Sequence, residues 1–513
     1  MSNQTSLASI APDRRIAGVL FRWGCLSVYT ACCLLWWARK SWSPEWDSAI
    51  YILAGRSLAQ GGGYSYLQHP FFLRPPGFSW LLSFLVGGGE TPFFLLNRLV
   101  MFFAAASVVL VYLAFRREGR WTALSVALLS GTCSLFARHF NLVLSDFPFM
   151  ALLFASIALC ERAEEERPGW WGWACGAGLC VAGAIYMRSA GLVLVPAMLL
   201  GIVFTRRDSL RWRVLLPAAI ALALSVPWWL HSAAARKSAE RPSEQLLLFD
   251  YATAMGHVDP GDPSSAWIGL EGWLARIQQN GVALCRDLSE AVFLPDRPWA
   301  TALLLGVLLA GAACKVKSSF GVPERFALLY SLLVLTYFAY DTRLVLPLVP
   351  FLYRWILETI RWIGLRLLSS VGRASQRVLL HGAVTGALLL PNVLTLPSIV
   401  QHEERMVETP AQGGVWNELT DVADWIRENT PRDAVLLCNQ APVLSLLTDR
   451  RAFTYRFLRA PDPLSRYGVD YVVFDADPPP GLESEVSTRA RKCQLIPGAR
   501  QGRMILICEI ARP

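Results

Sequence analysis

The residues best suited to chemistry lie in one polar stretch, SPEWDSAIYILAGRSLAQGGGYSYLQHPFFLRPPGFSWLL, which directly follows an apolar run. The stretch contains two acids, a histidine and an arginine that are candidates for a site: Glu45, Asp47, His69 and Arg74. A carboxylate can take a proton from a reacting hydroxyl group. The planar guanidinium group of an arginine matches the oxygens of a phosphate. The stretch therefore indicates a site in which a base and a phosphate-binding cation act together.

The spacing within this stretch predicts a helix over residues 46–60 that lies on the outer membrane surface. Asp47 and Tyr51 share one face of this helix, and Asp47 falls in the first turn, where the helix dipole favours a carboxylate. A run of three glycines ends the helix, and the prolines after Arg74 begin the next element. Two simpler interpretations stay open. Asp47 is alternatively an ordinary helix-start residue, and Arg74 alternatively reaches up to lipid phosphates.

Further charged residues fall at turns between apolar runs, in the stretches LSDFPFM, YMRSAGLVLVP and YDTRLVLPLVP. They are Asp146, Arg188, and Arg343 with Asp341 shortly before it. A charge at membrane depth is costly and usually faces a cavity. Alternatively, Ser145 or Asp146 caps a helix, and Asp341 and Arg343 form a surface ion pair that contributes little.

The composition is that of a membrane protein. Of the 513 residues, 54% are hydrophobic and 17% are charged, whereas soluble domains average about 25% charged residues. The 20 tryptophans and 25 phenylalanines fit aromatic belts at two membrane interfaces. The net charge of +9 is explained by lysines and arginines retained on the cytoplasmic side. The sequence has no nucleic-acid-binding pattern, so no nucleic-acid partner is expected.

Eleven apolar runs approach the length of about 20 residues that a helix needs to cross a bilayer. They lie near residues 17–38, 93–114, 121–138, 144–160, 170–187, 190–205, 213–231, 299–314, 325–341, 344–364 and 378–398. Lysine and arginine are concentrated in alternate loops, which places the N-terminus in the cytoplasm. We therefore predict an α-helical polytopic protein of the inner (cytoplasmic) membrane, with about 11 transmembrane helices and an uncleaved first helix.

In this orientation two long loops, residues 39–92 and 232–298, fall on the periplasmic side. The chain beyond residue 398 falls there as well. Its short apolar strands alternate with helical patterns, as in VWNELTDVADWIRE and VDYVVFD. Residues 399–513 are therefore predicted to form a small periplasmic α/β domain after the transmembrane domain of residues 1–398.

Most of the 12 cysteines lie in apolar runs, where they act as small hydrophobic residues. No CxxC pair is present, so the sequence does not predict a structural zinc site. Cys493 and Cys508 lie in the predicted periplasmic tail and can form a disulfide if their strands are neighbours.

Taken together, these stretches resemble the membrane-embedded C-type glycosyltransferases, in particular the bacterial branch with protein O-mannosyltransferases and lipid A aminoarabinose transferases. WDSAIYILAGRSLAQGGGY is similar to the family's first periplasmic loop, and FLRPPGFSWLL is similar to its basic-Pro-Pro segment. LSDFPFM is similar to its acidic-x-Pro motif, and MRSAGLVLVP and TRLVLPLVPFLY are similar to its later arginine signatures. The resemblance covers roughly residues 15–400 and says little about the tail.

The resemblance implies a role for each matching residue. Asp47 is the expected catalytic base, and Arg74 and Arg343 are expected to bind the phosphate of a polyprenyl-phosphate sugar donor. Five more residues are expected to help position the substrates: Asp146, Tyr51, Arg188, Glu45 and His69. The metal site of the aminoarabinose transferases does not map onto this sequence, so a divalent metal stays open without an assigned ligand, and no other cofactor is expected.

The expected reaction is an inverting transfer of the sugar to a hydroxyl group of a protein, lipid or glycan acceptor on the periplasmic side. Two other functions are open alternatives: a transporter or flippase of lipid-linked sugars, and a non-catalytic envelope scaffold. A transporter would need charges deep inside helices or matched broken helices. A scaffold would leave the acids and arginines of the outer face unexplained.

Overall fold

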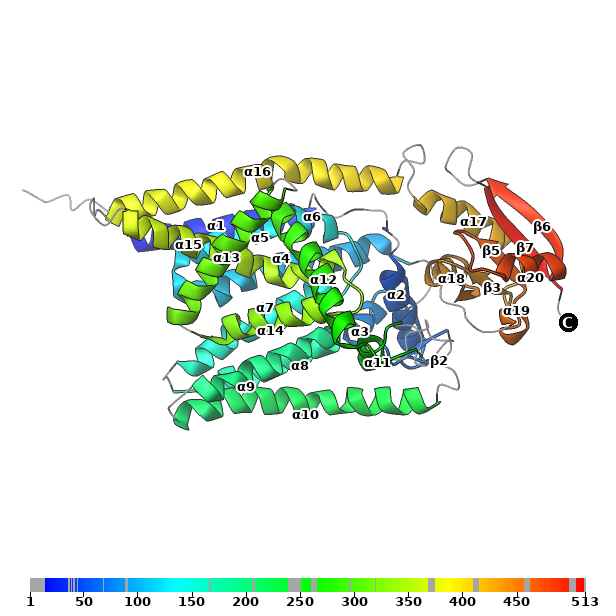
Figure 1. Cartoon of the computed structure of the whole chain (residues 1–513), viewed down its shortest axis with the longest axis horizontal. Helices are drawn as coiled ribbons and strands as arrows, with labels where there is room; N and C mark the ends of the chain where they lie inside the picture. Colours follow the sequence, from blue (N-terminus) through cyan, green and yellow to red (C-terminus); the bar gives the residue numbers. More distant parts are fainter. Residues whose placement is uncertain are drawn as a thin grey trace, which may run out of the picture.

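The structure of the protein, a computed structural model, is largely helical (Figure 1). It describes residues 14–35, 37, 39, 42–43, 45–67, 69–87, 91–165, 168–204, 208–238, 251–259, 265–294, 297–318, 320–367, 374–408, 415–455, 462–497 and 504–511. Residues 1–13, which are predicted to be cytoplasmic, lie outside the described residues, as do residues 239–250 of the second predicted periplasmic loop.

Each predicted apolar run lies on a helix, because a helix pairs its own backbone groups where no water is present. These helices are α1 (Arg14–Leu35), α4 (Phe93–Ala114), α5 (Arg120–Thr132), α7 (Asp146–Glu164), α8 (Trp170–Met187), α9 (Leu194–Phe204), α10 (Asp208–Ser238), α13 (Pro298–Ser318), α14 (Val322–Thr336), α15 (Val349–Leu367) and α16 (Ala374–Glu408). Among the described residues, five helices are both long and apolar enough to span a membrane: α1, α4, α10, α13 and α16. The chain is a multi-pass membrane protein, and the number of eleven crossings stays a prediction.

The helices pack closely where small residues meet large ones. A Cβ atom added to Gly178 of α8 would lie 2.8 Å from Cβ of Ile220 in α10, so the glycine permits this close approach. The rings of Phe136 and Phe140 lie 5.4 and 5.9 Å from the ring of Phe147, and all three are buried. Phe136 belongs to α6 (Ser134–His139), and this aromatic group packs the start of α7 against the preceding turn.

The first predicted periplasmic loop folds into α2 (Trp46–Ala59), the hairpin strands β1 (Ser65–Tyr66) and β2 (His69–Pro70), and α3 (Gly77–Ser83). The helix predicted over residues 46–60 is therefore present, but it is buried within the protein instead of lying on its surface. Consecutive residues from Ser48 to Ile52 are buried, so every face of this part of the helix is covered. A Cβ atom on Gly55 would lie 3.0 Å from the Ser79 carbonyl oxygen of α3, which is therefore in close contact with α2.

The second predicted periplasmic loop contains α11 (Tyr251–Gly256) and α12 (Leu270–Ala291). The α12 helix exposes apolar side chains at Leu270, Leu274 and Val282, whereas Leu284 and Leu288 nearer its end are buried. It packs against α14 and against the 3-10 helix η4 (Thr342–Leu348), which joins α14 to α15.

The described residues after α16 form a mixed sheet of five strands with flanking helices, called the C-terminal unit below. Its elements are α17 (Val415–Asn429), β3 (Val435–Cys438), α18 (Ala441–Thr448), β4 (Arg451–Thr454), α19 (Pro463–Arg466), β5 (Tyr471–Phe474), α20 (Leu482–Arg489), β6 (Ala490–Pro497) and β7 (Met504–Ile510). The strand order is β4-β3-β5-β7-β6. β3 is parallel to β4 and β5, and β7 is antiparallel to β5 and β6.

Two features connect the C-terminal unit with the predictions. Cys493 of β6 lies directly opposite Cys508 of β7, and the two form a disulfide. The domain boundary predicted at residue 398 falls inside α16, which continues to Glu408.

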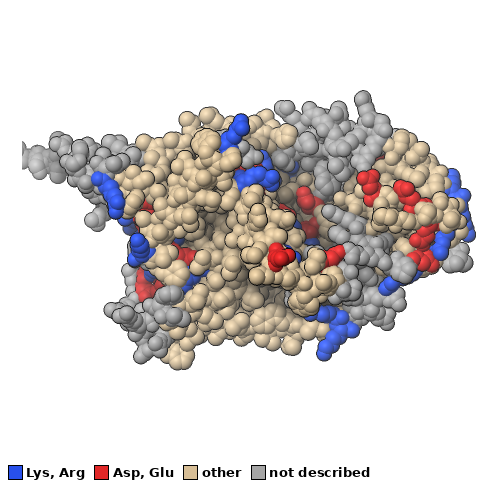
Figure 2. Space-filling view, in the orientation of Figure 1, with Lys and Arg blue, Asp and Glu red and all other residues tan. Residues whose placement is uncertain are grey.

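Figure 2 shows acidic and basic side chains gathered over the C-terminal unit, whereas the visible face of the helical part is mostly uncharged.

The C-terminal unit packs against the helical part through α18 and α2 (Figure 1). Buried side chains of the two helices belong to one apolar cluster, among them Ala49, Ile52, Ala441, Val443 and Leu444. At the edge of this contact, Arg56 Nη1 lies 2.9 Å from Asp449 Oδ1. The helix that carries Asp47 is therefore held between α3 and the C-terminal unit.

A buried ionic cluster joins several helices near the start of α14, at the opposite end of that helix from η4. Arg354 of α15, whose side chain is 2% exposed, pairs with Glu324 of α14 and with Glu118 of the 3-10 helix η1 (Arg116–Glu118). Lys315 Nζ, at the end of α13, lies 2.9 Å from Glu118 Oε2. Removing Arg354 takes the buried counter-charge from Glu324 and leaves Glu118 with Lys315, which is costly away from water.

We expect the Arg354→Ala variant to lose about 3–5 kcal/mol of unfolding free energy, because two glutamates lose their buried partner. The matched control is Arg361→Ala on the same helix, whose side chain is 56% exposed and pairs with Glu358 at 3.7 Å. Loss of such a surface pair costs at most about 1 kcal/mol. Thermal unfolding in detergent measures both changes, and equal shifts in melting temperature would contradict the importance of the buried cluster.

Candidate active site

Two arginines hold the carboxylate of Asp47. Arg74 Nη2 lies 2.5 Å from Asp47 Oδ1, and Arg343 Nη2 lies 2.6 Å from Asp47 Oδ2. These three residues are called the Asp47 cluster below. Their side chains are 19%, 13% and 22% exposed for Asp47, Arg74 and Arg343, so the cluster is shielded from water but still reachable. The structure thus brings together the three residues expected to carry the chemistry.

The start of α2 places Asp47. Glu45 is the N-cap of this helix, and its backbone N–H donates to Ser48 Oγ at 3.2 Å. The Ser48 hydroxyl donates in turn to the Glu45 carbonyl oxygen at 2.9 Å. Asp47 therefore sits in the first turn of a well-capped helix, where the helix dipole favours its negative charge.

The two arginines are placed by contacts of their own segments. The Tyr64 hydroxyl donates to the carbonyl oxygen of Arg74 at 2.8 Å, just before the prolines that begin α3. Asp341 caps η4, because its Oδ1 accepts from the backbone N–H of Arg343 at 3.0 Å. Arg343 Nε also lies 2.8 Å from Asp341 Oδ2. The ion pair between Asp341 and Arg343 is therefore present, and it leaves the outer end of the guanidinium group for Asp47.

The arginines set the protonation state of Asp47. Burial acts to raise the pKa of this carboxyl group, but the positive charges of Arg74 and Arg343 outweigh it and hold the pKa well below its usual value. The charge of Arg188 acts in the same downward direction. Asp47 is therefore ionised at neutral pH, which is the state that a base requires.

A second ion pair, between Asp146 and Arg188, lies close to the Asp47 cluster. Asp146 begins α7, Arg188 follows the end of α8, and their side chains are 5% and 16% exposed. Tyr51 lies between the two pairs: its hydroxyl is 3.1 Å from Ser145 Oγ, and the Arg74 guanidinium carbon lies 5.4 Å from its ring centre. Tyr51, Asp146 and Arg188 therefore belong to the same polar centre as the cluster.

Two of the predicted site residues, Glu45 and His69, have structural contacts outside the Asp47 cluster. Glu45 caps α2, and His69 of β2 pairs with Tyr66 of β1 in the hairpin. Among the residues that the structure describes, no hydrogen bond or ion pair joins His69 to the Asp47 cluster. The role of Glu45 and His69 in positioning a substrate stays a prediction.

The structure adds Ser145 and Tyr64 to the predicted site residues. The sequence indicates Ser145 only as a helix cap, whereas in the structure its hydroxyl contacts the hydroxyl of Tyr51. Tyr64 directly follows the glycine run, in which Gly61 and Gly63 have φ angles of 78° and 71°. Glycine adopts such angles without strain. The glycine run was therefore a signal for a sharp turn that directs Tyr64 back toward Arg74.

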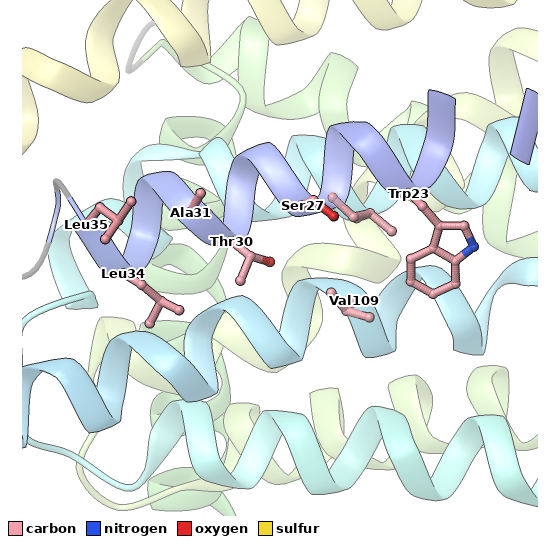
Figure 3. A pocket seen from close by; sticks show the side chains of 8 residues that line it. Trp23, Ser27, Thr30, Ala31, Leu34, Leu35 and Val109 are labelled. Atoms are coloured by element: carbon pink, nitrogen blue, oxygen red, sulfur yellow. The ribbon is translucent and has the colours of Figure 1, made fainter. Parts of the chain in front are cut away.

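No group of three or more His, Cys, Asp or Glu side chains is placed to hold a metal ion within the described part of the chain. A cavity of about 420 Å³ lies elsewhere, between α1 and α4 (Figure 3). It is lined by Trp23, Leu26, Ser27, Thr30, Ala31, Leu34, Leu35 and Val109. This lining is mainly apolar and contains none of the predicted site residues.

We expect the Asp47→Asn variant to be less stable at neutral pH by about 3 kcal/mol, because two guanidinium groups lose their shared counter-charge. Folding lowers the pKa of Asp47. Its contribution is therefore fully present above the unfolded pKa of about 3.9 and is lost as the pH falls toward the folded pKa. The difference in melting temperature between wild type and variant should stay constant from about pH 8 to about pH 5.

The control for this measurement is Asp424→Asn, because the Asp424 side chain is 54% exposed and its pair with Arg427 lies on the surface. It should change the melting temperature little at any pH. A difference for Asp47→Asn that disappears between pH 8 and pH 6 would contradict the lowered pKa.

The chain is similar to known proteins in part of its sequence and in its fold. Residues 73–231 match the family described as dolichyl-phosphate-mannose-protein mannosyltransferase, and this segment contains Arg74, Asp146 and Arg188. No curated protein sequence matches the chain.

Solved structures share the fold over most of the chain. ArnT from Cupriavidus metallidurans in the apo state is 13% identical, with 97% of this chain and 98% of that chain covered and a TM-score of 0.57. The same protein bound to undecaprenyl phosphate is 14% identical, with coverages of 96% and 98% and a TM-score of 0.52. The archaeal oligosaccharyltransferase AglB from Archaeoglobus fulgidus, in complex with an inhibitory peptide and a dolichol-phosphate, is 13% identical, with coverages of 90% and 69% and a TM-score of 0.55. The chain thus has the fold of the membrane-embedded C-type glycosyltransferases, as its motifs predicted, and over residues 73–231 it carries the sequence pattern of the mannosyltransferase family.

Proposed function

We propose that this protein is a membrane glycosyltransferase that moves a sugar from a polyprenyl-phosphate donor to a hydroxyl group of an acceptor. The observation that carries the proposal is the Asp47 carboxylate between the guanidinium groups of Arg74 and Arg343. The match to a dolichyl-phosphate-mannose family, and the fold shared with proteins solved with undecaprenyl phosphate or dolichol-phosphate, supports a lipid-phosphate donor. The acceptor is a protein, lipid or glycan with a free hydroxyl group.

In the proposed reaction the acceptor oxygen attacks the anomeric carbon of the sugar, and Asp47 accepts the proton of that hydroxyl group. The new carbon–oxygen bond forms as the bond from the anomeric carbon to the phosphate oxygen breaks. The electron pair leaves with the polyprenyl phosphate on the opposite face, so the configuration inverts. Phosphate is a competent leaving group without a protein acid, and Arg74 and Arg343 stabilise its growing negative charge by about 3 kcal/mol or more.

The site offers guanidinium groups to an incoming phosphate. Arg74, Arg188 and Arg343 each pair with an acid there, namely Asp47, Asp146 and Asp341. Arg74 Nη1 is buried and has no hydrogen-bond acceptor within the described residues, so it can donate to a phosphate oxygen. A phosphate that neutralises these arginines also weakens the positive charge that lowers the pKa of Asp47. Donor binding would therefore make the carboxylate a stronger base at the moment when it is needed.

We further propose that the reaction takes place on the periplasmic side of the inner membrane, with about eleven crossings and a cytoplasmic N-terminus. The disulfide between Cys493 and Cys508 supports a periplasmic C-terminal unit, because disulfides persist in oxidising compartments. The turn between α4 and α5 carries Arg116, Arg117 and Arg120, which supports a cytoplasmic location for the opposite ends of the helices.

The first test uses labelled polyprenyl-phosphate sugars with membranes that contain the variants. We expect Asp47→Asn and Arg74→Ala each to lower transfer by about 100-fold or more. The controls are Asp424→Asn and Arg427→Ala, an exposed pair on α17 with side chains 54% and 49% exposed, which should transfer at the wild-type rate. Transfer by Asp47→Asn at the wild-type rate would exclude it as the base, and translocation without transfer would indicate a carrier.

The second test concerns sidedness. We expect a cysteine in place of Glu483, in the first turn of α20, to react with a membrane-impermeant maleimide in cells with a permeable outer envelope. A cysteine in place of Arg120, which is exposed at the start of α5, should react only after the inner membrane is opened. The parent chain with its own cysteines provides the background. Reaction in the reverse order would contradict the proposed orientation.

A further inference from the structure

We propose that Asp287, acting through the hydroxyl group of Tyr340, is a positioning residue that aligns Arg343 for the phosphate of the donor. The inference rests on the proposed function, because it assumes that Arg343 binds this phosphate. Asp287 lies in the second predicted periplasmic loop and matches none of the motifs that identified the site.

Asp287 is a buried carboxylate that needs a partner. It is 3% exposed, and its Oδ2 accepts a hydrogen bond from the Tyr340 hydroxyl at 2.7 Å. The neighbouring Arg286 is 64% exposed, and its Nε lies 3.9 Å from Asp287 Oδ1, so it contributes little. A buried charge is costly unless it is hydrogen-bonded. The contact with Tyr340 is therefore a fixed point between α12 and the segment that leads into η4.

Tyr340 is joined to the Asp47 cluster through a short chain of contacts. The next residue, Asp341, accepts from the backbone N–H of Arg343 at 3.0 Å, and its other oxygen lies 2.8 Å from Arg343 Nε. Arg343 Nη2 then reaches Asp47 Oδ2 at 2.6 Å. A displacement of Tyr340 would therefore be transmitted to the guanidinium group that faces Asp47.

A second residue of α12 holds the other end of the same segment. The side-chain amide of Asn280, which is 6% exposed, donates to the carbonyl oxygens at the end of α14. The acceptors and distances are Val334 at 3.2 Å, Leu335 at 3.0 Å and Tyr337 at 2.7 Å. Asn280 and Asp287 lie about two turns apart on α12, so one rigid helix holds the chain from the end of α14 to η4.

The end of α12 is itself tied to the helical part. The Tyr353 hydroxyl of α15 donates to the Ala291 carbonyl oxygen at 2.6 Å, and Arg138 Nη2 lies 2.5 Å from Glu290 Oε1. Asp287 therefore projects from an anchored helix, and its hydrogen bond can fix the position of Tyr340 and of the segment that leads to Arg343. A merely structural contact would affect stability alone, whereas a positioning contact affects phosphate binding through Arg343.

The test measures binding of undecaprenyl phosphate to the full-length protein in detergent. We expect Tyr340→Phe and Asp287→Ala to weaken binding by about 10-fold, because a small displacement of a binding group has a large effect. Asp287→Asn keeps an oxygen that can accept from Tyr340 and should bind nearly as wild type does. Arg286→Ala, which leaves that hydrogen bond in place, is the matched control and should bind as wild type does.

The double variants show whether the effect passes through Arg343. In the Arg343→Ala background, Tyr340→Phe should weaken binding no further, because the residue that it positions is gone. An equal further loss in that background, or wild-type binding by Tyr340→Phe alone, would overturn the inference. Absence of binding by the wild type itself would instead contradict the lipid-phosphate donor of the proposed function. Tyr340→Phe removes a single hydroxyl group, so the test stands even if Asp287→Ala fails to fold.

Discussion

A carboxylate shielded from water must be neutralised, and the two guanidinium groups around Asp47 meet that need in this protein. Arg74 comes from the segment before α3, and Arg343 comes from η4 between α14 and α15. Their convergence requires the first predicted periplasmic loop to pack against a helix junction far along the chain. The same ion pairs hold Asp47 in its ionised form, so they link the fold around the site to the chemistry that we propose.

The surrounding elements keep these charged groups in place. The C-terminal unit covers α2 through α18, and the ion pair of Arg56 with Asp449 lies at the edge of that contact. The aromatic group around Phe147 packs the start of α7, which carries Asp146 beside Arg188. Hydrogen-bond donors and charges that are oriented before the reaction need no reorganisation during it. Such preorganised groups therefore stabilise the charge that develops in the transition state.

Prediction from the sequence succeeded where a signal was local. The apolar runs placed the helices, and the capping and charge patterns placed Asp47 in the first turn of α2. Prediction failed where burial depends on elements that are distant in the sequence. The burial of α2 was not expected, because the helices that cover it, α3 and α18, lie elsewhere in the chain. Strand β4 was not expected, because its residues, RAFT, include one large apolar side chain and therefore lack the apolar run that marks β3 and β5.

The amino-acid sequence by itself determined a membrane protein with acids and arginines at the ends of its helices, because hydropathy and charge are properties of each segment alone. The pairing of these residues was decided by the tertiary structure. Asp146 and Arg188 were separate candidates in the sequence, Asp287 lay in none of the motifs, and Tyr340, directly before Asp341, was not a candidate. An ion pair or hydrogen bond depends on distances of a few ångströms between side chains, and such distances follow only from the packing of whole helices.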